Sequence, residues 1–117
     1  MLPAQNRLRR RQDFANVYAR GDRYRGQYLR LRVYDTGNLE FASQIGIVIS
    51  KKISKSAVIR NRIKRQLRAI FRQLLSQLKQ GLQIVVTVST LEGSPSYGQL
   101  QDDLTKLSIK AQVLHGS

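Results

Sequence analysis

SAVIRNRIKRQLRAIFRQLLSQLKQ, residues 56–80, is the longest segment of the chain with the periodicity of a helix. Its apolar residues recur at steps of three and four, so they share one face, and Gly81 follows as a stop signal. Because such a face is usually buried, we expect it to contribute to the core. The apolar face consists of Ile63, Leu67, Ile70, Phe71, Leu74 and Leu78.

Runs with strand character flank this helix on both sides. Residues 45–49 (IGIVI) precede it and residues 83–88 (QIVVTV) follow it, and both runs are rich in β-branched side chains. Such runs predict buried strands. A strand, a long helix and another strand in succession predict a crossover unit within one mixed sheet.

Shorter elements complete the expected fold. The alternation of apolar and polar residues predicts a strand at residues 28–34, and a further strand is expected at residues 39–42. Helices are expected at residues 10–19 and, with one apolar stripe, from Tyr97 to Leu114. The order α-β-β-β-α-β-α places the chain in the α+β class, as a two-layer sandwich with a mixed sheet and a crossover helix.

Length and composition limit the class of protein. The chain has 117 residues, enough for one domain with one core, and we expect residues 1–6 to be flexible and residues 115–117 to be frayed. It contains no cysteine, which excludes disulfides and thiolate metal sites. No apolar run is long enough to span a bilayer, and the first residues do not resemble a secretion signal. We therefore expect a soluble protein of the cytoplasm.

Charge is distributed unevenly along the chain. The net charge is +14, and residues 1–72 carry all of the excess, with eighteen of the 21 basic residues and four of the seven acids. Nine basic residues and no acid lie between Lys51 and Arg72. Self-repulsion on this scale destabilises a small domain, so the pattern indicates a polyanionic partner. A basic face that serves only solubility usually has acids interspersed.

The long helix carries much of this charge beside its apolar face. Arg60 and Arg62 lie in its first turns, where the helix dipole is already positive and acids would be favourable. A bound anion would reverse that cost, because helix N–H groups and fixed cations would converge on a phosphate. At 100° per residue, further polar side chains form one stripe next to the apolar face. This basic stripe comprises Asn61, Lys64, Arg65, Arg68 and Arg72.

The same helix resembles a signature of the bacterial ribonuclease P protein family. Residues 60–68 (RNRIKRQLR) resemble its Arg-Asn-Arg block, which continues into Lys-Arg and a further Arg. Residues 46–52 (GIVISKK) resemble a family strand that ends in two basic residues. Residues 13–21, which include Asp13-Phe14, Val17-Tyr18 and Gly21, resemble the family's first helix. These blocks follow the family's order within residues 7–90.

The resemblance implies both a fold and a function. The fold is like the second domain of ribosomal protein S5, with a left-handed crossover, which is a rare hand. The function is that of a subunit, a monomer when free, which forms a one-to-one complex with a large catalytic RNA. The RNA catalyses removal of the 5′ leader of precursor tRNA, and Mg²⁺ is bound mainly by the RNA and the substrate. No catalytic or metal-binding residue is expected in this chain, and no association with membranes.

The resemblance also assigns residues to two surfaces. Phe14, Tyr18, Lys51 and Lys52 are expected in a cleft for the leader. Phe14 and Tyr18 could instead be core residues, and Lys51 and Lys52 point opposite ways at a strand end, so that one of them could be merely solvated. The surface for the catalytic RNA is expected to contain Arg60, Asn61, Arg62, Lys64, Arg65 and Arg68, to which the basic stripe adds Arg72.

The sequence departs from the family pattern at two places. Residues 53–56 (ISKS) form the turn before the long helix without the glycine that many members have there. The strand at 28–34 carries Arg30 and Arg32 where members often have apolar or aromatic residues. Asn61 also has an alternative role, since its side chain could satisfy a local backbone group.

Other functions fit the sequence less well. An autonomous nuclease needs clustered carboxylates or a pair of histidines, whereas the seven acids form no motif and His115 is the single histidine. A helix-turn-helix DNA reader needs two helices joined by a tight turn, whereas strands flank the basic helix. The alternative function is that of a ribosomal or other structural RNA-binding protein with no part in tRNA processing. Such proteins commonly have long basic tails, but the basic block here lies inside the fold.

Overall fold

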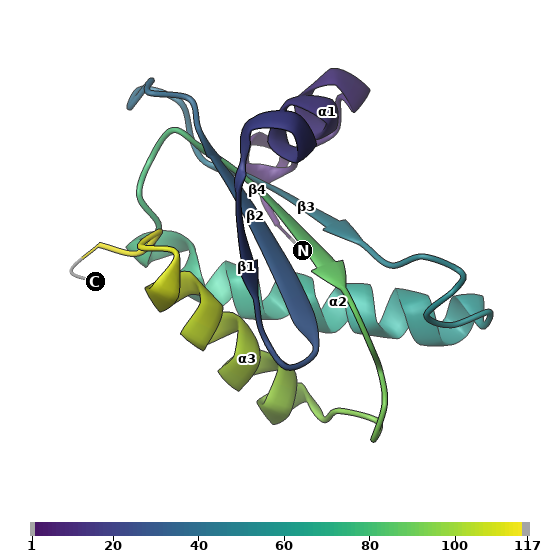
Figure 1. Cartoon of the computed structure of the whole chain (residues 1–117). Helices are drawn as coiled ribbons and strands as arrows, with labels where there is room; N and C mark the ends of the chain where they lie inside the picture. The colour runs from purple at the N-terminus through teal and green to yellow at the C-terminus, as the bar shows by residue number, and fades with distance from the viewer. Residues whose placement is uncertain (1, 116–117) are drawn as a thin grey trace.

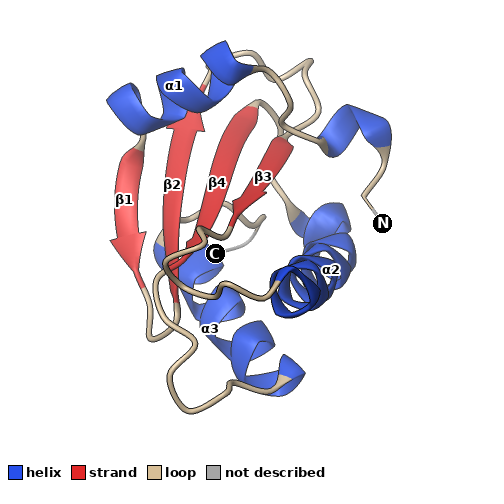
Figure 2. Ribbon diagram, turned by 90° about the vertical axis from the view of Figure 1, so that its right-hand side faces the viewer, coloured by secondary structure: helices blue, strands red, loops and turns tan. Residues whose placement is uncertain are grey.

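The computed structural model describes residues 2–115. Four strands form one sheet in the order β1-β2-β4-β3. Figures 1 and 2 show α2 and α3 together on one face of the sheet and α1 across one end of the other face. The elements in chain order, with η for a 3₁₀ helix, are η1 (Ala4–Asn6), α1 (Arg11–Arg20), β1 (Asp22–Arg25), β2 (Leu29–Asp35), β3 (Gln44–Val48), α2 (Ala57–Leu74), η2 (Leu75–Gln77), β4 (Leu82–Val88) and α3 (Tyr97–Lys110).

The sheet is mixed, as the sequence predicts. β2 pairs antiparallel with both β1 and β4, whereas β3 pairs parallel with β4. The helix α2 connects these two parallel neighbours, so the predicted crossover unit is confirmed. The α+β class and the element order are confirmed as well.

The main core lies between the sheet and the layer formed by α2 and α3. Leu29 and Leu31 of β2, and Ile84 and Val86 of β4, alternate with residues that point to the other face of the sheet. Burying each such side chain stabilises the fold by about 1.5–3 kcal/mol. The predicted apolar face of the long helix is confirmed as core, with Leu74 half-buried at its margin. The helices contribute Ile63, Leu67, Ile70, Phe71, Leu100, Leu104 and Leu107.

A smaller apolar cluster fixes α1 on the opposite face. Val17 is fully buried and packs with Leu8 and Val85, and half-buried Phe14 joins them. Phe14 lies over Gly46 of β3, where a Cβ atom would be 2.6 Å from the aromatic ring. A larger residue at that position would push α1 off the sheet. Gly46 therefore permits the close approach that places α1 across the strands.

The prediction of a strand at residues 39–42 is wrong. Side-chain oxygens of Asp35 and Asn38 accept hydrogen bonds from N–H groups two residues further on, and these local bonds turn the chain. The third strand before α2 is β1, at residues 22–25 rather than 39–42, and it pairs antiparallel with β2. Three of its four residues are charged, so no apolar alternation marked it in the sequence.

The long helix also ends earlier than predicted. α2 stops at Leu74 and continues as η2, whereas Gly81, the expected stop, lies in the turn before β4. Gly81 has a positive φ of 78°, and a Cβ atom there would lie 2.5 Å from the carbonyl oxygen of Asn38. Its role is thus to let the loop at residues 36–43 approach β4. Within the described residues, none of the helices has both the length and the apolar character needed to cross a membrane.

The two ends of the described chain pack on the domain. Although residues 1–6 were expected to be flexible, Leu2 is buried and the side-chain amide of Asn6 donates to the carbonyl of Ser43 at 2.8 Å. Arg7 then forms a parallel bridge with Ile45, so this segment covers part of the edge of β3. At the other end, the N–H group of His115 donates to the carbonyl of Gln77. The rest of the expected frayed tail, residues 116–117, lies outside the described residues.

α3 is fixed by polar contacts as well as by its apolar face. A capping box between Ser96 and Gln99 satisfies N–H groups of its first turn. Asp103 is buried, and its carboxylate accepts three backbone hydrogen bonds of 2.8–3.0 Å from the turn of the β1–β2 hairpin. The donors are Gln27, Tyr28 and Leu29.

Candidate nucleic-acid interface

The turn before α2 positions the first basic residues of that helix. The hydroxyl oxygen of Ser56 caps α2 by accepting from the N–H group of Ile59 at 3.3 Å. Arg60 reaches back, and its Nη1 donates to the carbonyl of Ser54 at 2.6 Å. The turn is therefore closed without a glycine. Arg60 is half-buried and held in place, whereas Asn61 and Arg62 are exposed.

The basic stripe lies beside the buried face of α2, as predicted. Arg65, Arg68 and Arg72 are exposed, and Lys64 is half-buried. Leu67 and Ile70 of the same helix are buried, so the two faces are distinct. Among the described residues, Arg65 and Arg68 form no ion pair with an acid. Their charges are thus available to a partner, and guanidinium groups suit bidentate contacts with phosphate.

The N-terminal segment extends this cationic surface. Arg68 lines a hollow of about 170 Å³ together with Arg7 and Arg9, which come from the segment before α1. Phe14 and Gly46 line the same hollow. The basic stripe and the first helix, which are far apart in sequence, therefore meet at the edge of β3. Arg7 and Arg9 were not among the predicted site residues, because only the tertiary fold brings them to α2.

The two aromatic residues of α1 occupy different environments. Phe14 is half-buried in the smaller cluster, so its ring supports the position of α1 as well as one wall of the hollow beside Arg68. Tyr18 is 38% exposed, and the guanidinium carbon of Arg32 lies 4.5 Å from the centre of its ring. Such a cation–π pair orients both groups. Tyr18 is thus an exposed ring with the guanidinium group of Arg32 lying over it.

Four arginines lie next to Tyr18 on the same face of the sheet. Arg23 is directly opposite Arg32 across the β1–β2 ladder, and Arg25 is directly opposite Arg30. Like charges placed opposite one another are destabilising, and among the described residues no acid forms an ion pair with any of the four. A bound polyanion would offset this repulsion. We call Arg23, Arg25, Arg30 and Arg32 the arginine quartet.

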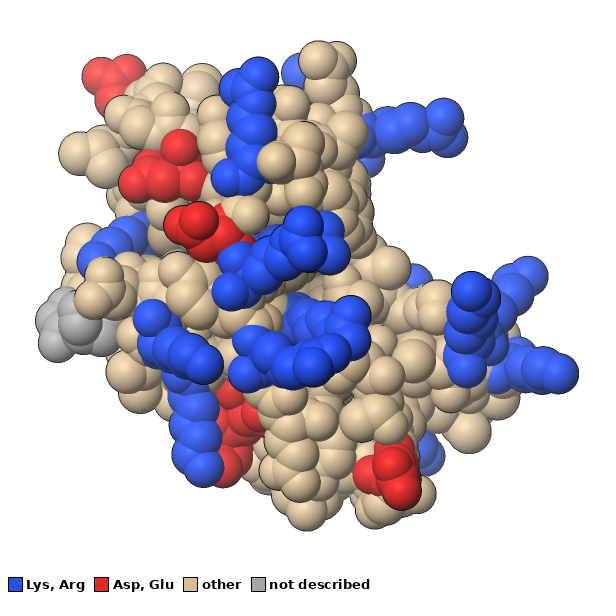
Figure 3. All heavy atoms as spheres, viewed as in Figure 1, with Lys and Arg blue, Asp and Glu red and all other residues tan. Residues whose placement is uncertain are grey.

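The sequence alone does not show that these four arginines lie together. The alternation in the strand at 28–34 marks Arg30 and Arg32 as sharing one face, but their partners on β1 become evident only from the register. Figure 3 shows a group of basic side chains at the centre of the face seen in Figure 1, over β1 and β2. The four arginines line a hollow of about 230 Å³ with Tyr24 and Leu31.

Lys51 and Lys52 occupy a different position from Phe14 and Tyr18. Both lysines are exposed in the turn that follows β3, beyond Val48, whereas Phe14 packs at Gly46. The chain then leads directly into α2. The two lysines are therefore located between the sheet and the start of the basic helix, and their assignment to the leader cleft stays a prediction.

Two acidic residues of α3 make structural contacts. Asp103 binds the hairpin turn, and Asp102 forms an ion pair of 3.0 Å with Lys106 on the surface of α3. Within residues 2–115, no three of the His, Cys, Asp and Glu side chains gather into a group that could hold a metal ion. The donor set of the described residues thus does not fit a dedicated Mg²⁺ site of the protein.

The fold and these surfaces define a class of protein. A small α+β domain with a net charge of +14 carries its cations on a helix flank and on a sheet face, and both surfaces are suited to a polyanion. This combination is typical of proteins that bind nucleic acid.

Comparison with known sequences identifies the family within this class. The sequence model of the Ribonuclease P family matches residues 2–112, and the chain belongs to this family. A ribonuclease P protein component from Pseudanabaena is 66% identical over the whole length of both chains. The corresponding protein from Cyanothece is 42% identical, with 99% of each chain covered.

Solved structures agree with this assignment. The RNase P protein of Staphylococcus aureus superposes with a TM-score of 0.82 at 26% identity, covering 94% of this chain and 98% of that one. The RNase P protein of Thermotoga maritima gives a TM-score of 0.75 at 28% identity, covering 86% and 93%. The family predicted from the sequence is thereby confirmed.

Proposed function

We propose that this chain is the protein component of ribonuclease P and assists removal of the 5′ leader from precursor tRNA. The observation that carries the proposal is the division of its cations between two surfaces in a member of this family. One surface is the basic stripe of α2 and the other is the sheet face with Tyr18 and the arginine quartet. The alternative of a structural RNA-binding protein outside tRNA processing has no comparable support from the matched relatives.

The basic stripe is the proposed contact with the RNA subunit. Its exposed arginines are fixed on a rigid helix, which suits phosphates held at defined positions in a folded RNA. Arg60 is held by Ser54, so its guanidinium group has little freedom to lose on binding. We place one protein on each RNA and regard the free protein as a monomer of the cytoplasm.

The face beside α1 is the proposed contact with the leader. A leader is single-stranded, so its bases are free to stack on an aromatic ring while its phosphates follow a cationic groove. Tyr18 offers the ring, and Arg32 beside it offers the charge. Stacking tolerates any base, which suits a subunit that handles many precursor tRNAs. Phe14 contributes by holding α1 at this height above the sheet.

Catalysis is assigned to the RNA partner rather than to this chain. Hydrolysis of a phosphodiester requires a group that activates water, and the acids of this protein are engaged in structural contacts or lie apart. We propose that the Mg²⁺ ions of the reaction are held by the RNA and its substrate. The protein would lower the concentration of Mg²⁺ that is needed, because its cations screen repulsion between the two RNAs.

Reconstitution with a bacterial ribonuclease P RNA tests this function. At low Mg²⁺ concentration, cleavage of precursor tRNA should require both the RNA and the protein, and the protein alone should be inactive. Cleavage by the RNA-free protein that is lost on mutation of a carboxylate would overturn the assignment of catalysis. Failure of the protein to bind the RNA or to stimulate cleavage would overturn the function itself.

A further inference from the structure

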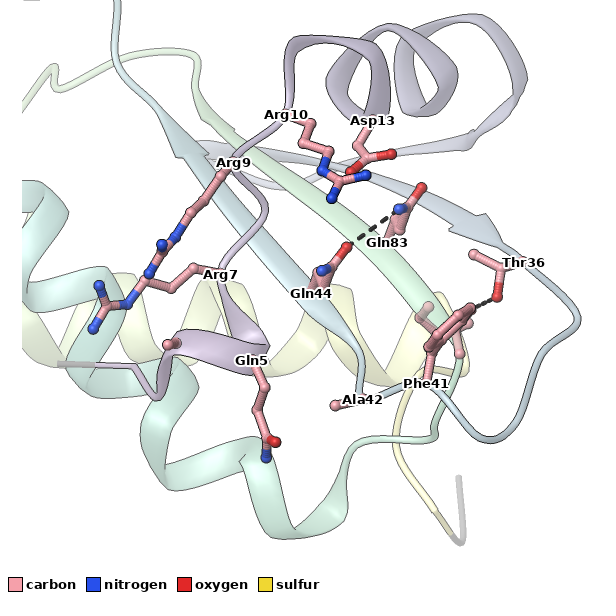
Figure 4. Close-up of a pocket in the computed structure, with 13 residues that line it drawn as sticks. Gln5, Arg7, Arg9, Arg10, Asp13, Thr36, Phe41, Ala42, Gln44 and Gln83 are labelled. Atoms are coloured by element: carbon pink, nitrogen blue, oxygen red, sulfur yellow. Dashed lines mark hydrogen bonds between the residues drawn. The ribbon is translucent and has the colours of Figure 1, made fainter.

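A third hollow lies on the side of α1 away from the arginine quartet. Phe14 and Tyr18 lie over the row of paired residues Gly46, Val85 and Arg32, so α1 crosses the sheet there. Gln44 and Gln83 lie one step before that row on the same face. They form the floor of a hollow of about 700 Å³, which Figure 4 shows. We call it the N-terminal hollow, because the segment before α1 borders it.

Phe41 is an exposed aromatic wall of this hollow. Its side chain is 62% exposed, although exposure of a phenyl ring to water is unfavourable. The backbone at this point is fixed, since the carbonyl of Phe41 accepts from the N–H group of Gly81 at 2.8 Å and Thr36 donates to the carbonyl of Gly81 at 2.7 Å. Because this backbone is fixed, the ring is presented to the hollow as a surface on which a flat ligand can stack.

The floor offers hydrogen-bonding groups of both kinds. Gln83 Nε2 donates to Gln44 Oε1 at 3.3 Å, which fixes the two amides relative to one another. Two groups of these amides have no partner among the described residues. They are the NH₂ group of Gln44 and the carbonyl oxygen of Gln83. One donor and one acceptor side by side match the polar edge of a nucleobase.

Arginines connect the hollow to α2. Figure 4 shows the guanidinium group of Arg10 between the carboxylate of Asp13, which also lines the hollow, and the two amides. The guanidinium groups of Arg7 and Arg9 point away from the amides. Arg7 and Arg9 line both the N-terminal hollow and the smaller hollow that contains Arg68. A cationic path therefore runs from the basic stripe to this site along the N-terminal segment. An RNA that contacts Arg68 can reach the N-terminal hollow without passing over Tyr18 and the arginine quartet, the part of this face that is assigned to the leader.

We propose that the N-terminal hollow binds one unpaired nucleotide of the RNA subunit. The base stacks on Phe41 and bonds through its edge to Gln44 and Gln83, and its phosphate lies at Arg10. The volume of about 700 Å³ is within the range of about 300–1,000 Å³ that is usual for sites of small organic ligands. This inference rests on the proposed function, because it takes the partner of α2 to be the ribonuclease P RNA.

Two exposed apolar residues of one loop provide a matched test. Phe41→Ala removes the proposed stacking surface, whereas Leu39→Ala removes a side chain that is 74% exposed and does not line the hollow. The measurement is the dissociation constant of the full-length protein for ribonuclease P RNA transcribed in vitro. Phe41→Ala should weaken binding by about five- to a hundredfold, the range expected for loss of one stacked base. Leu39→Ala should change the dissociation constant by no more than about twofold. Phe41→Trp, which keeps an aromatic ring at this position, should bind the RNA as the wild-type protein does.

The outcomes separate this inference from the proposed function. If the wild-type protein binds the RNA but Phe41→Ala and Leu39→Ala have the same affinity, the nucleotide site is wrong and the proposed function stands. If the wild-type protein does not bind the RNA, the proposed function itself has failed. A photoreactive group at position 41 should cross-link to the RNA subunit at an unpaired nucleotide. Cross-links to precursor tRNA alone would overturn the choice of partner.

Discussion

α2 and α3 pack on the same face of the sheet, but their polar residues are used in opposite ways. α3 has a capping box, an ion pair between Asp102 and Lys106, and a buried Asp103 that binds a neighbouring turn. α2 has six basic residues and no acid, and two of its arginines lie near the N-terminus, where the helix dipole disfavours them.

The polar face of α3 stabilises the fold, whereas the polar face of α2 is available for recognition, although both helices belong to the same layer. Each polar group described for α3 satisfies a partner inside the protein. Arg65 and Arg68 of α2, by contrast, form no ion pair with an acid among the described residues, and repulsion between such cations lowers the stability of the free domain. Buried apolar faces are common to both helices, so mutations on those faces should be equivalent, and mutations on the polar faces should not.

The largest expected effect tests the equivalence of the apolar faces. Leu67→Ala in α2 and Leu104→Ala in α3 each remove a fully buried side chain. Each should lower the free energy of unfolding by about 3–5 kcal/mol, through lost burial and a residual cavity. Urea denaturation monitored by circular dichroism measures this. A much smaller loss for Leu67→Ala would mean that α2 is held by something other than its apolar face.

The next effect concerns the polar face of α3. Asp103→Ala leaves three backbone N–H groups of the hairpin turn without their acceptor, and should cost about 2–3 kcal/mol of unfolding free energy. Asp102→Ala is the matched control, because its ion pair is well exposed and such pairs contribute about 0.5 kcal/mol or less. Equal losses at the two positions would refute the structural role that we assign to Asp103.

A third prediction places recognition on α1. Tyr18→Ala should weaken binding of precursor tRNA with a long 5′ leader by about 1–3 kcal/mol and leave binding of mature tRNA almost unchanged. Val17→Ala, at the buried neighbour, should instead lower the melting temperature and weaken both equally. If Tyr18→Ala behaves like Val17→Ala, then Tyr18 is a core residue and the leader assignment is wrong.

The smallest effect on stability is expected on the polar face of α2. Arg65→Ala should change the unfolding free energy by less than about 0.5 kcal/mol, since Arg65 is exposed and has no ion pair among the described residues. Binding to the ribonuclease P RNA should weaken, and the slope of log K against log salt should fall by about 0.7–0.9 for one lost phosphate contact. An unchanged affinity with an unchanged slope would show that Arg65 is only solvated.

The sequence predicts the basic stripe of α2 better than it predicts the arginine quartet. The basic stripe follows from a helical period that is local to α2, and its buried neighbours Leu67 and Ile70 confirm it. The arginine quartet depends on pairing between β1 and β2, and a strand as charged as β1 has no apolar signal.

The N-terminal hollow was beyond sequence reasoning for a related reason. Arg10, Phe41 and Gln83 come from three separate segments, and the contact at Gly81 brings the loop to the strand. The glycine was visible in the sequence, but its periodic context suggested a helix stop. Phe41 falls within the strand predicted at residues 39–42, which the structure replaces by a turn.

The two edges of the sheet have a consequence for the protein before it meets RNA. An open edge strand presents unpaired N–H and C=O groups, to which a strand of another molecule can add. β3 is shielded by the bridge from Arg7 to Ile45, and β1 carries Arg23 and Arg25, whose charges repel a second copy placed alongside. The arginines proposed to face the leader therefore also oppose aggregation while the chain is unassembled. Replacing them with neutral residues should therefore favour self-association of the free protein.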